Sequence, residues 1–126
     1  MDFNMRDEII TLLKNKLSNS DEVLFGYLFG SYAINKQTKT SDIDLALYLC
    51  NTNFDTKLQI NYELSKLLKK DVDLVVLNDI KNIYLMENIL KDGIVIKDHN
   101  KRFDFEVMKH HDILDYKAFR KYIDAA

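Results

Sequence analysis

The chain has 126 residues, 47% of them hydrophobic and 30% charged, so it is long enough to bury a core and its composition excludes disordered and fibrous classes. Its 20 acidic residues outnumber 18 lysines and arginines, which argues against a broad nucleic-acid-binding surface. The single cysteine cannot form an internal disulfide, and no apolar run is long enough to span a membrane. The N-terminus lacks the organisation of a secretory signal, so we expect one cytoplasmic domain covering residues 1–126.

Apolar residues recur with helical spacing near the N-terminus and predict a helix from about Asn4 to Ser18. A turn cluster then leads into the apolar run Val23–Phe29, which is typical of a strand buried on both faces. The run ends in Gly30 and Ser31, and we expect a short helix at 32–34 followed by a polar loop.

The remaining elements follow from the same two periodicities of apolar residues. They are a strand over 42–49, a helix over 54–69, a strand over 71–77, a helix over 80–90, a strand over 94–96 and a final helical region from residue 100. Together they predict an α/β (α+β) fold, in which helices pack over a small mixed sheet of about four strands.

Two aspartates, Asp42 and Asp44, open the second predicted strand. Because side chains alternate along a strand, both carboxylates project to one face, close enough to share divalent cations such as Mg²⁺. Gly30 allows a tight turn with no side chain in the way, and Ser31 is expected to cap a helix whose amides face a phosphate. The pattern indicates phosphoryl or nucleotidyl transfer, although an ordinary turn and a water-facing Asp42 are the alternative.

A third carboxylate is expected at Asp73, in the strand over 71–77. Asp73 is embedded in an apolar run, where an ionised carboxylate is costly unless it is paired or bound to metal. Asp71 lies at the edge of this run and is expected to be solvated. The alternative is that Asp73 is a strand-edge residue that faces water.

Gly30–Ser31, Asp42–Ile43–Asp44, the strand Val72–Val76 and a tail from Arg102–Phe103 through Asp115–Tyr116 carry a resemblance. In these positions the chain resembles the minimal nucleotidyltransferase (MNT) antitoxins of the DNA polymerase β superfamily, which are paired with HEPN toxins. The resemblance implies the polymerase β-type fold and AMP transfer from ATP to a tyrosine of a HEPN ribonuclease toxin. It also implies that Asp42, Asp44 and Asp73 hold two Mg²⁺ ions, that Gly30 and Ser31 anchor phosphates, and that Asp73 activates the acceptor hydroxyl.

Members of this family commonly read Gly-Ser-x-Ala-Arg-Gly, whereas this chain has Ile34–Asn35 in place of the Arg-Gly pair. The three aspartates are intact. Lys36 and Lys39 in the following loop either contact the triphosphate or are only solvated. Arg102 either contacts phosphates or pairs with an acid. The apolar residues Phe119, Tyr122 and Ile123 in the tail either pack in the core or bind the partner.

Two other functions stay open at this point. The chain could act as an antitoxin by tight binding with little catalysis, a reading that the missing Arg-Gly pair favours. It could also be a nucleotidyltransferase that modifies a small molecule, because the nucleotide half of the site would look identical.

Overall fold

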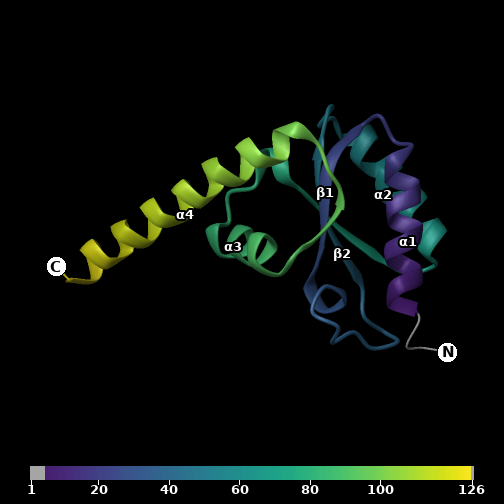
Figure 1. The fold of residues 1–126 in the computed structure, drawn as a ribbon, viewed down its shortest axis with the longest axis horizontal. Helices are drawn as coiled ribbons and strands as arrows, with labels where there is room; N and C mark the ends of the chain where they lie inside the picture. Colours follow the sequence, from purple (N-terminus) through teal and green to yellow (C-terminus); the bar gives the residue numbers. More distant parts are fainter. Residues whose placement is uncertain (1–4, 126) are drawn as a thin grey trace.

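A four-stranded mixed sheet forms the centre of the computed structural model, which describes residues 5–125 (Figure 1). β1 (Val23–Phe29) pairs antiparallel with β2 (Ile43–Leu49) and with β4 (Ile94–Lys97), and β2 pairs in parallel with β3 (Val72–Val76). The strand order is β3-β2-β1-β4, so β3 and β4 are the edges. The mixed sheet confirms the predicted fold class.

Helices cover both faces of this sheet. α1 (Met5–Ser18) and α2 (Phe54–Leu68) pack on one face, and α3 (Ile83–Asp92) with the first half of α4 (Asn100–Ala125) packs on the other. The two cores share β1, because Leu28 faces the first pair while Phe25, Tyr27 and Phe29 face the second. This alternation confirms that β1 is buried on both faces.

Two short 3₁₀ turns mark where the predicted boundaries are wrong. η2 (Gly30–Tyr32) begins at the glycine, so the helix expected at 32–34 does not form. η3 (Leu77–Asp79) ends β3 early, and α3 begins only at Ile83 because the Asn82 side chain accepts a hydrogen bond from the Leu85 amide. The Asn4 end of the first predicted helix lies outside the described residues. Among residues 5–125, no helix is both long and apolar enough to cross a bilayer.

Candidate active site

Strand pairing gathers the three predicted aspartates at one end of the sheet. Asp44 lies opposite Phe29 on β1 and opposite Asp73 on β3. Asp42 comes two residues before Asp44, just outside β2 and not within it as predicted. Because residues paired across strands, and alternate residues along one, share a face, the three side chains lie on the same side of the sheet.

Electrostatic repulsion within this cluster follows from its geometry. Burial, then the charge of Asp73, then the charge of Asp42 raise the pKa of the Asp44 carboxyl above its ordinary value of 3.8. Asp44 is half-buried, while Asp42 and Asp73 are exposed. Within the described part of the chain, none of the three carboxylates has a hydrogen-bond or ion-pair partner. The cluster is therefore a concentration of negative charge that the described chain does not neutralise.

The exposure of Asp73 corrects the reasoning by which it was predicted. β3 is an edge strand, so Asp73 reaches water and its ionised form incurs no burial cost. Asp73 faces water, as the alternative had it, but the parallel register also places it beside Asp44. The pairing of β3 with β2 places the Asp73 carboxylate in the cluster. Its apolar sequence neighbours do not bury it.

Gly30 fits against the central carboxylate in a way that no other residue could. Its φ is +73°, in the left-handed region that favours glycine, and a Cβ built there would lie 2.1 Å from Oδ2 of Asp44. The turn at the end of β1 and the Asp44 side chain thus depend on each other, because any side chain at position 30 would push the carboxylate away.

Ser31 does not cap a helix, contrary to the prediction. η2 is a single 3₁₀ turn with Phe29 in its N-cap position and no side-chain capping hydrogen bond. The Ser31 carbonyl accepts a hydrogen bond from the Lys36 amide at 2.9 Å, which closes the loop that follows. Its hydroxyl has no hydrogen-bond partner among the residues that the structure describes.

An arginine from α1 braces this turn and was missed in the sequence. Arg6 Nε donates to the Tyr32 carbonyl at 2.6 Å, and Nη2 donates to the Ala33 carbonyl at 3.1 Å. Asn35, where the family pattern has glycine, has a φ of 59°, a left-handed conformation that asparagine tolerates. Asn35 thus adopts a conformation that glycine also favours, and Arg6 of α1 holds the two backbone carbonyls at Tyr32 and Ala33.

The donor set suits Mg²⁺, although the described side chains do not bring three such ligands onto one ion position. Mg²⁺ takes oxygen ligands and is usually held by one or two carboxylates, with waters and substrate phosphates completing its shell. Carboxylates without a protein counter-charge fit that requirement. Two or three of these aspartates would hold the metal, with water and substrate phosphates supplying its other ligands.

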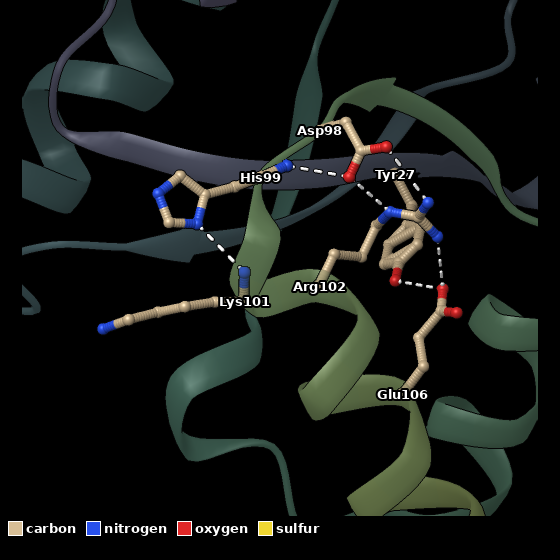
Figure 2. Close-up of polar contacts among 6 residues, drawn as sticks. All are labelled: Tyr27, Asp98, His99, Lys101, Arg102 and Glu106. Atoms are coloured by element: carbon tan, nitrogen blue, oxygen red, sulfur yellow. Dashed lines mark hydrogen bonds and ion pairs between the residues drawn. The ribbon is translucent and has the colours of Figure 1, made fainter.

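Arg102 belongs to a hydrogen-bond network that joins α4 to β1 (Figure 2). It donates to both carboxylate oxygens of Asp98, at 2.7 and 3.1 Å, and to Glu106 at 3.0 Å. Glu106 also accepts a hydrogen bond from the buried Tyr27 hydroxyl at 2.6 Å, and burial followed by Glu106 raises the pKa of Tyr27. Of the two roles predicted for Arg102, pairing with an acid is confirmed.

The loop between η2 and β2 carries both predicted lysines on its surface. Lys36 and Lys39 are exposed, and the Lys39 carbonyl accepts a hydrogen bond from Lys70 Nζ at 3.0 Å. Thr38 and Ser41 bond to each other, with the Thr38 amide donating to Ser41 Oγ at 2.8 Å. The loop is thus tied at its end next to the carboxylates, and a role of its lysines in phosphate binding stays a prediction.

Known proteins similar to this chain fall into two groups. The family model for polymerase beta nucleotidyltransferases matches residues 11–102. Two Methanocaldococcus jannaschii relatives, MJ0126 and MJ1379, each named as a candidate protein adenylyltransferase, are 38% and 35% identical, with 71% of this chain and 92% of each relative covered.

The second group consists of solved toxin–antitoxin structures. A chain of a toxin–antitoxin crystallised with AMP-PNP has a TM-score of 0.73 at 27% identity, with 95% of both chains covered. A chain from the complex of the tri-AMPylated Shewanella oneidensis HEPN toxin with its MNT antitoxin has a TM-score of 0.67 at 25% identity, over 99% of this chain and 97% of that one. The likeness to these structures therefore extends over nearly the whole chain.

Proposed function

The chain belongs to the polymerase β nucleotidyltransferase family, and on that premise we propose that it transfers AMP from ATP to a tyrosine of a HEPN-family toxin and so silences that toxin. Its relatives named as adenylyltransferases support AMP transfer, and the AMPylated HEPN toxin in a similar complex supports the acceptor. The observation that carries the proposal is the cluster of Asp42, Asp44 and Asp73. Its central member, Asp44, packs against Gly30 at the end of β1.

Each residue of the site has a part in this reaction. Asp42, Asp44 and Asp73 would hold Mg²⁺, two ions by family analogy, which when bound would neutralise the charge of the triphosphate. Gly30 lets the turn lie directly against the Asp44 carboxylate, and by family analogy Gly30 and Ser31 anchor a phosphate, to which the Ser31 hydroxyl donates a hydrogen bond. Asp73 accepts the proton of the acceptor hydroxyl, whose oxygen bonds to the α-phosphorus as the bond to pyrophosphate breaks.

Solvent exposure of the site favours a protein acceptor. Asp42 and Asp73 are both exposed, and Asp73 lies on an edge strand, so a tyrosine carried by another protein can approach from outside the sheet. A small-molecule acceptor would need further structure around the carboxylates to hold it. The proposal therefore places the acceptor on a partner chain, with ATP bound by this one.

Catalysis and tight binding are separated by removing charge from the cluster. The double variant Asp42→Asn with Asp44→Asn should lose AMP transfer to the HEPN protein encoded beside this chain, and should no longer stop its ribonuclease activity when ATP and Mg²⁺ are present. Asp71→Asn with Asp79→Asn is the matched control, because it neutralises two exposed carboxylates outside the cluster. If the cluster variant still silences the ribonuclease as well as wild type does, tight binding is the mechanism and the proposal is wrong.

A further inference from the structure

The second half of α4 projects away from the rest of the molecule. Figure 1 shows the helix starting beside the sheet, running away from it past α3, and ending beyond the other elements. Of its 26 residues only Phe105 and Ile113 are buried, and every residue from Lys117 to Ala125 is exposed. We call residues 114–125 the projecting segment. Tyr116 packs edge-on against Tyr84 of α3 and Lys117 pairs with Glu87, but every side chain after these two is exposed.

This segment is amphipathic. Phe119, Tyr122 and Ile123 follow at i, i+3 and i+4, so they share one side of the helix, and they are 58%, 74% and 50% exposed. Charged residues occupy the side nearer α3, where Lys117, Arg120 and Asp124 line a cavity of about 490 Å³ together with Tyr84 of α3. The apolar side therefore faces away from α3 and has no partner within the described residues.

A helix in this position gains little stability from its own chain. Most helical stability in proteins comes from packing of an apolar face, and the residues after Lys117 have no such packing within the described chain. Half of the exposed large hydrophobic side chains in the described chain lie on α4. Apolar anchors at i, i+3 and i+4, here two aromatic residues and an isoleucine, are what an amphipathic helix inserts into an apolar groove of a partner.

We propose that the projecting segment is the docking element for the HEPN-family toxin, with Phe119, Tyr122 and Ile123 inserted into an apolar groove of that protein. The identity of this occupant rests on the proposed function. The family model for the catalytic domain ends at residue 102, before the projecting segment begins. The match to the toxin–antitoxin chain with AMP-PNP instead covers 95% of this chain. The part of this chain left unmatched is much shorter than the 26 residues of α4, so most of α4 lies within the match.

This assignment divides two tasks along the chain. The sheet edge binds nucleotide and carries out transfer, while α4 selects the protein whose tyrosine is modified. The three aspartates at the end of the sheet do not by themselves distinguish one protein tyrosine from another. Binding of the projecting segment to one partner selects the tyrosine that is modified. The toxin specificity of the enzyme therefore depends on residues outside the region that the family model matches.

The test compares two pairs of aspartate substitutions in the full chain. Phe119→Asp with Tyr122→Asp alters the docking side of α4, and Leu58→Asp with Tyr62→Asp is the matched control on α2, where the side chains are 57% and 61% exposed. The dissociation constant for the HEPN protein is measured by titration calorimetry, and circular dichroism checks that both variants are folded. The Phe119→Leu variant, which keeps an apolar anchor, should bind nearly as well as wild type.

We expect the α4 pair to raise the dissociation constant by roughly 30-fold or more, and the KM for the HEPN protein with it, while the α2 pair changes neither by more than about twofold. A dissociation constant unchanged by the α4 pair overturns the docking assignment. So does equal weakening by both pairs. If the α4 pair abolishes only self-association, or only binding to anionic vesicles, the occupant is a second copy or a lipid surface, and the assignment to the toxin is also overturned.

Binding and transfer are read separately, so this inference and the proposed function fail in different ways. Wild type that binds the HEPN protein through α4 but adds no AMP would refute the transfer reaction and leave the docking assignment standing. Conversely, an α4 pair that transfers AMP with the wild-type KM would refute docking and leave the transfer reaction standing.

Discussion

Replacing Gly30 with alanine tests the most demanding contact of the site. The backbone at position 30 has a φ of +73°, where alanine costs about 1–2 kcal/mol relative to its ordinary conformations. The new Cβ would also lie 2.1 Å from Asp44 Oδ2, an overlap of the kind that costs about 1–3 kcal/mol when a packed site is overfilled. The free energy of unfolding should therefore fall by about 2–5 kcal/mol.

Both stability and activity report on this substitution. At roughly 4 °C per kcal/mol for a domain of this size, the melting temperature by circular dichroism should fall by about 8–20 °C. The overlap is relieved only if Asp44 moves, so the rate of AMP transfer, measured well below the melting temperature of the variant, should fall by about 100-fold. Gly30→Asn should lose activity to the same degree, because asparagine tolerates the positive φ but still carries a Cβ.

Gly26→Ala, within β1, is the matched control for the turn that follows this strand. A Cβ at position 26 would lie 2.4 Å from Leu47 Cδ2, which is also too close, but the φ there is not positive and no aspartate is involved. This variant should lose stability and still transfer AMP at close to the wild-type rate. A Gly30→Ala variant with both the wild-type melting temperature and the wild-type transfer rate would refute the dependence of the Asp44 position on Gly30.

Three further outcomes are expected. Asp44→Asn should abolish transfer yet raise the melting temperature at neutral pH, because burial and the charges of Asp73 and Asp42 raise the pKa of Asp44 in the folded chain. The difference in melting temperature from wild type should shrink as the pH falls through that raised pKa. Equal melting temperatures of the two proteins from pH 4 to 8 would contradict this. Arg6→Gln should raise the KM for ATP several-fold with a smaller effect on kcat, since both carbonyls of the turn lose their charged donor, whereas the exposed control Lys14→Gln should change neither. Tyr27→Phe should lower the free energy of unfolding by about 1 kcal/mol in urea titrations without changing transfer, and a drop in transfer rate would mean that the α4 network also positions the carboxylates.

The strands were the most predictable part of this fold. β1 runs from Val23 to Phe29 as predicted, because a continuous apolar run bounded by a turn cluster and by Gly30 leaves little choice. Helix boundaries that depend on side-chain hydrogen bonds were harder to predict from the sequence. The start of α3 was placed three residues too early, because the Asn82 cap is one of several polar residues that could have served.

The site was only partly accessible from the sequence. The spacing of Asp42 and Asp44 placed both carboxylates beside the turn at Gly30, and local alternation is enough for that inference. Asp73 was chosen for its apolar neighbours, but strand register is what brings it to Asp44. Arg6 could not have been found, since its partners are backbone carbonyls 26 and 27 residues away and no sequence pattern marks them.

The most direct test of AMP transfer is the intact mass of the HEPN protein encoded beside this chain, after incubation with the purified chain, ATP and Mg²⁺. We expect the mass to increase by one or more AMP units, with peptide mapping placing each on a tyrosine. Asp42→Asn with Asp44→Asn should give no increase, and Asp71→Asn with Asp79→Asn should give the wild-type increase. An unchanged mass with wild type, under conditions in which the two proteins form a complex, would contradict the account.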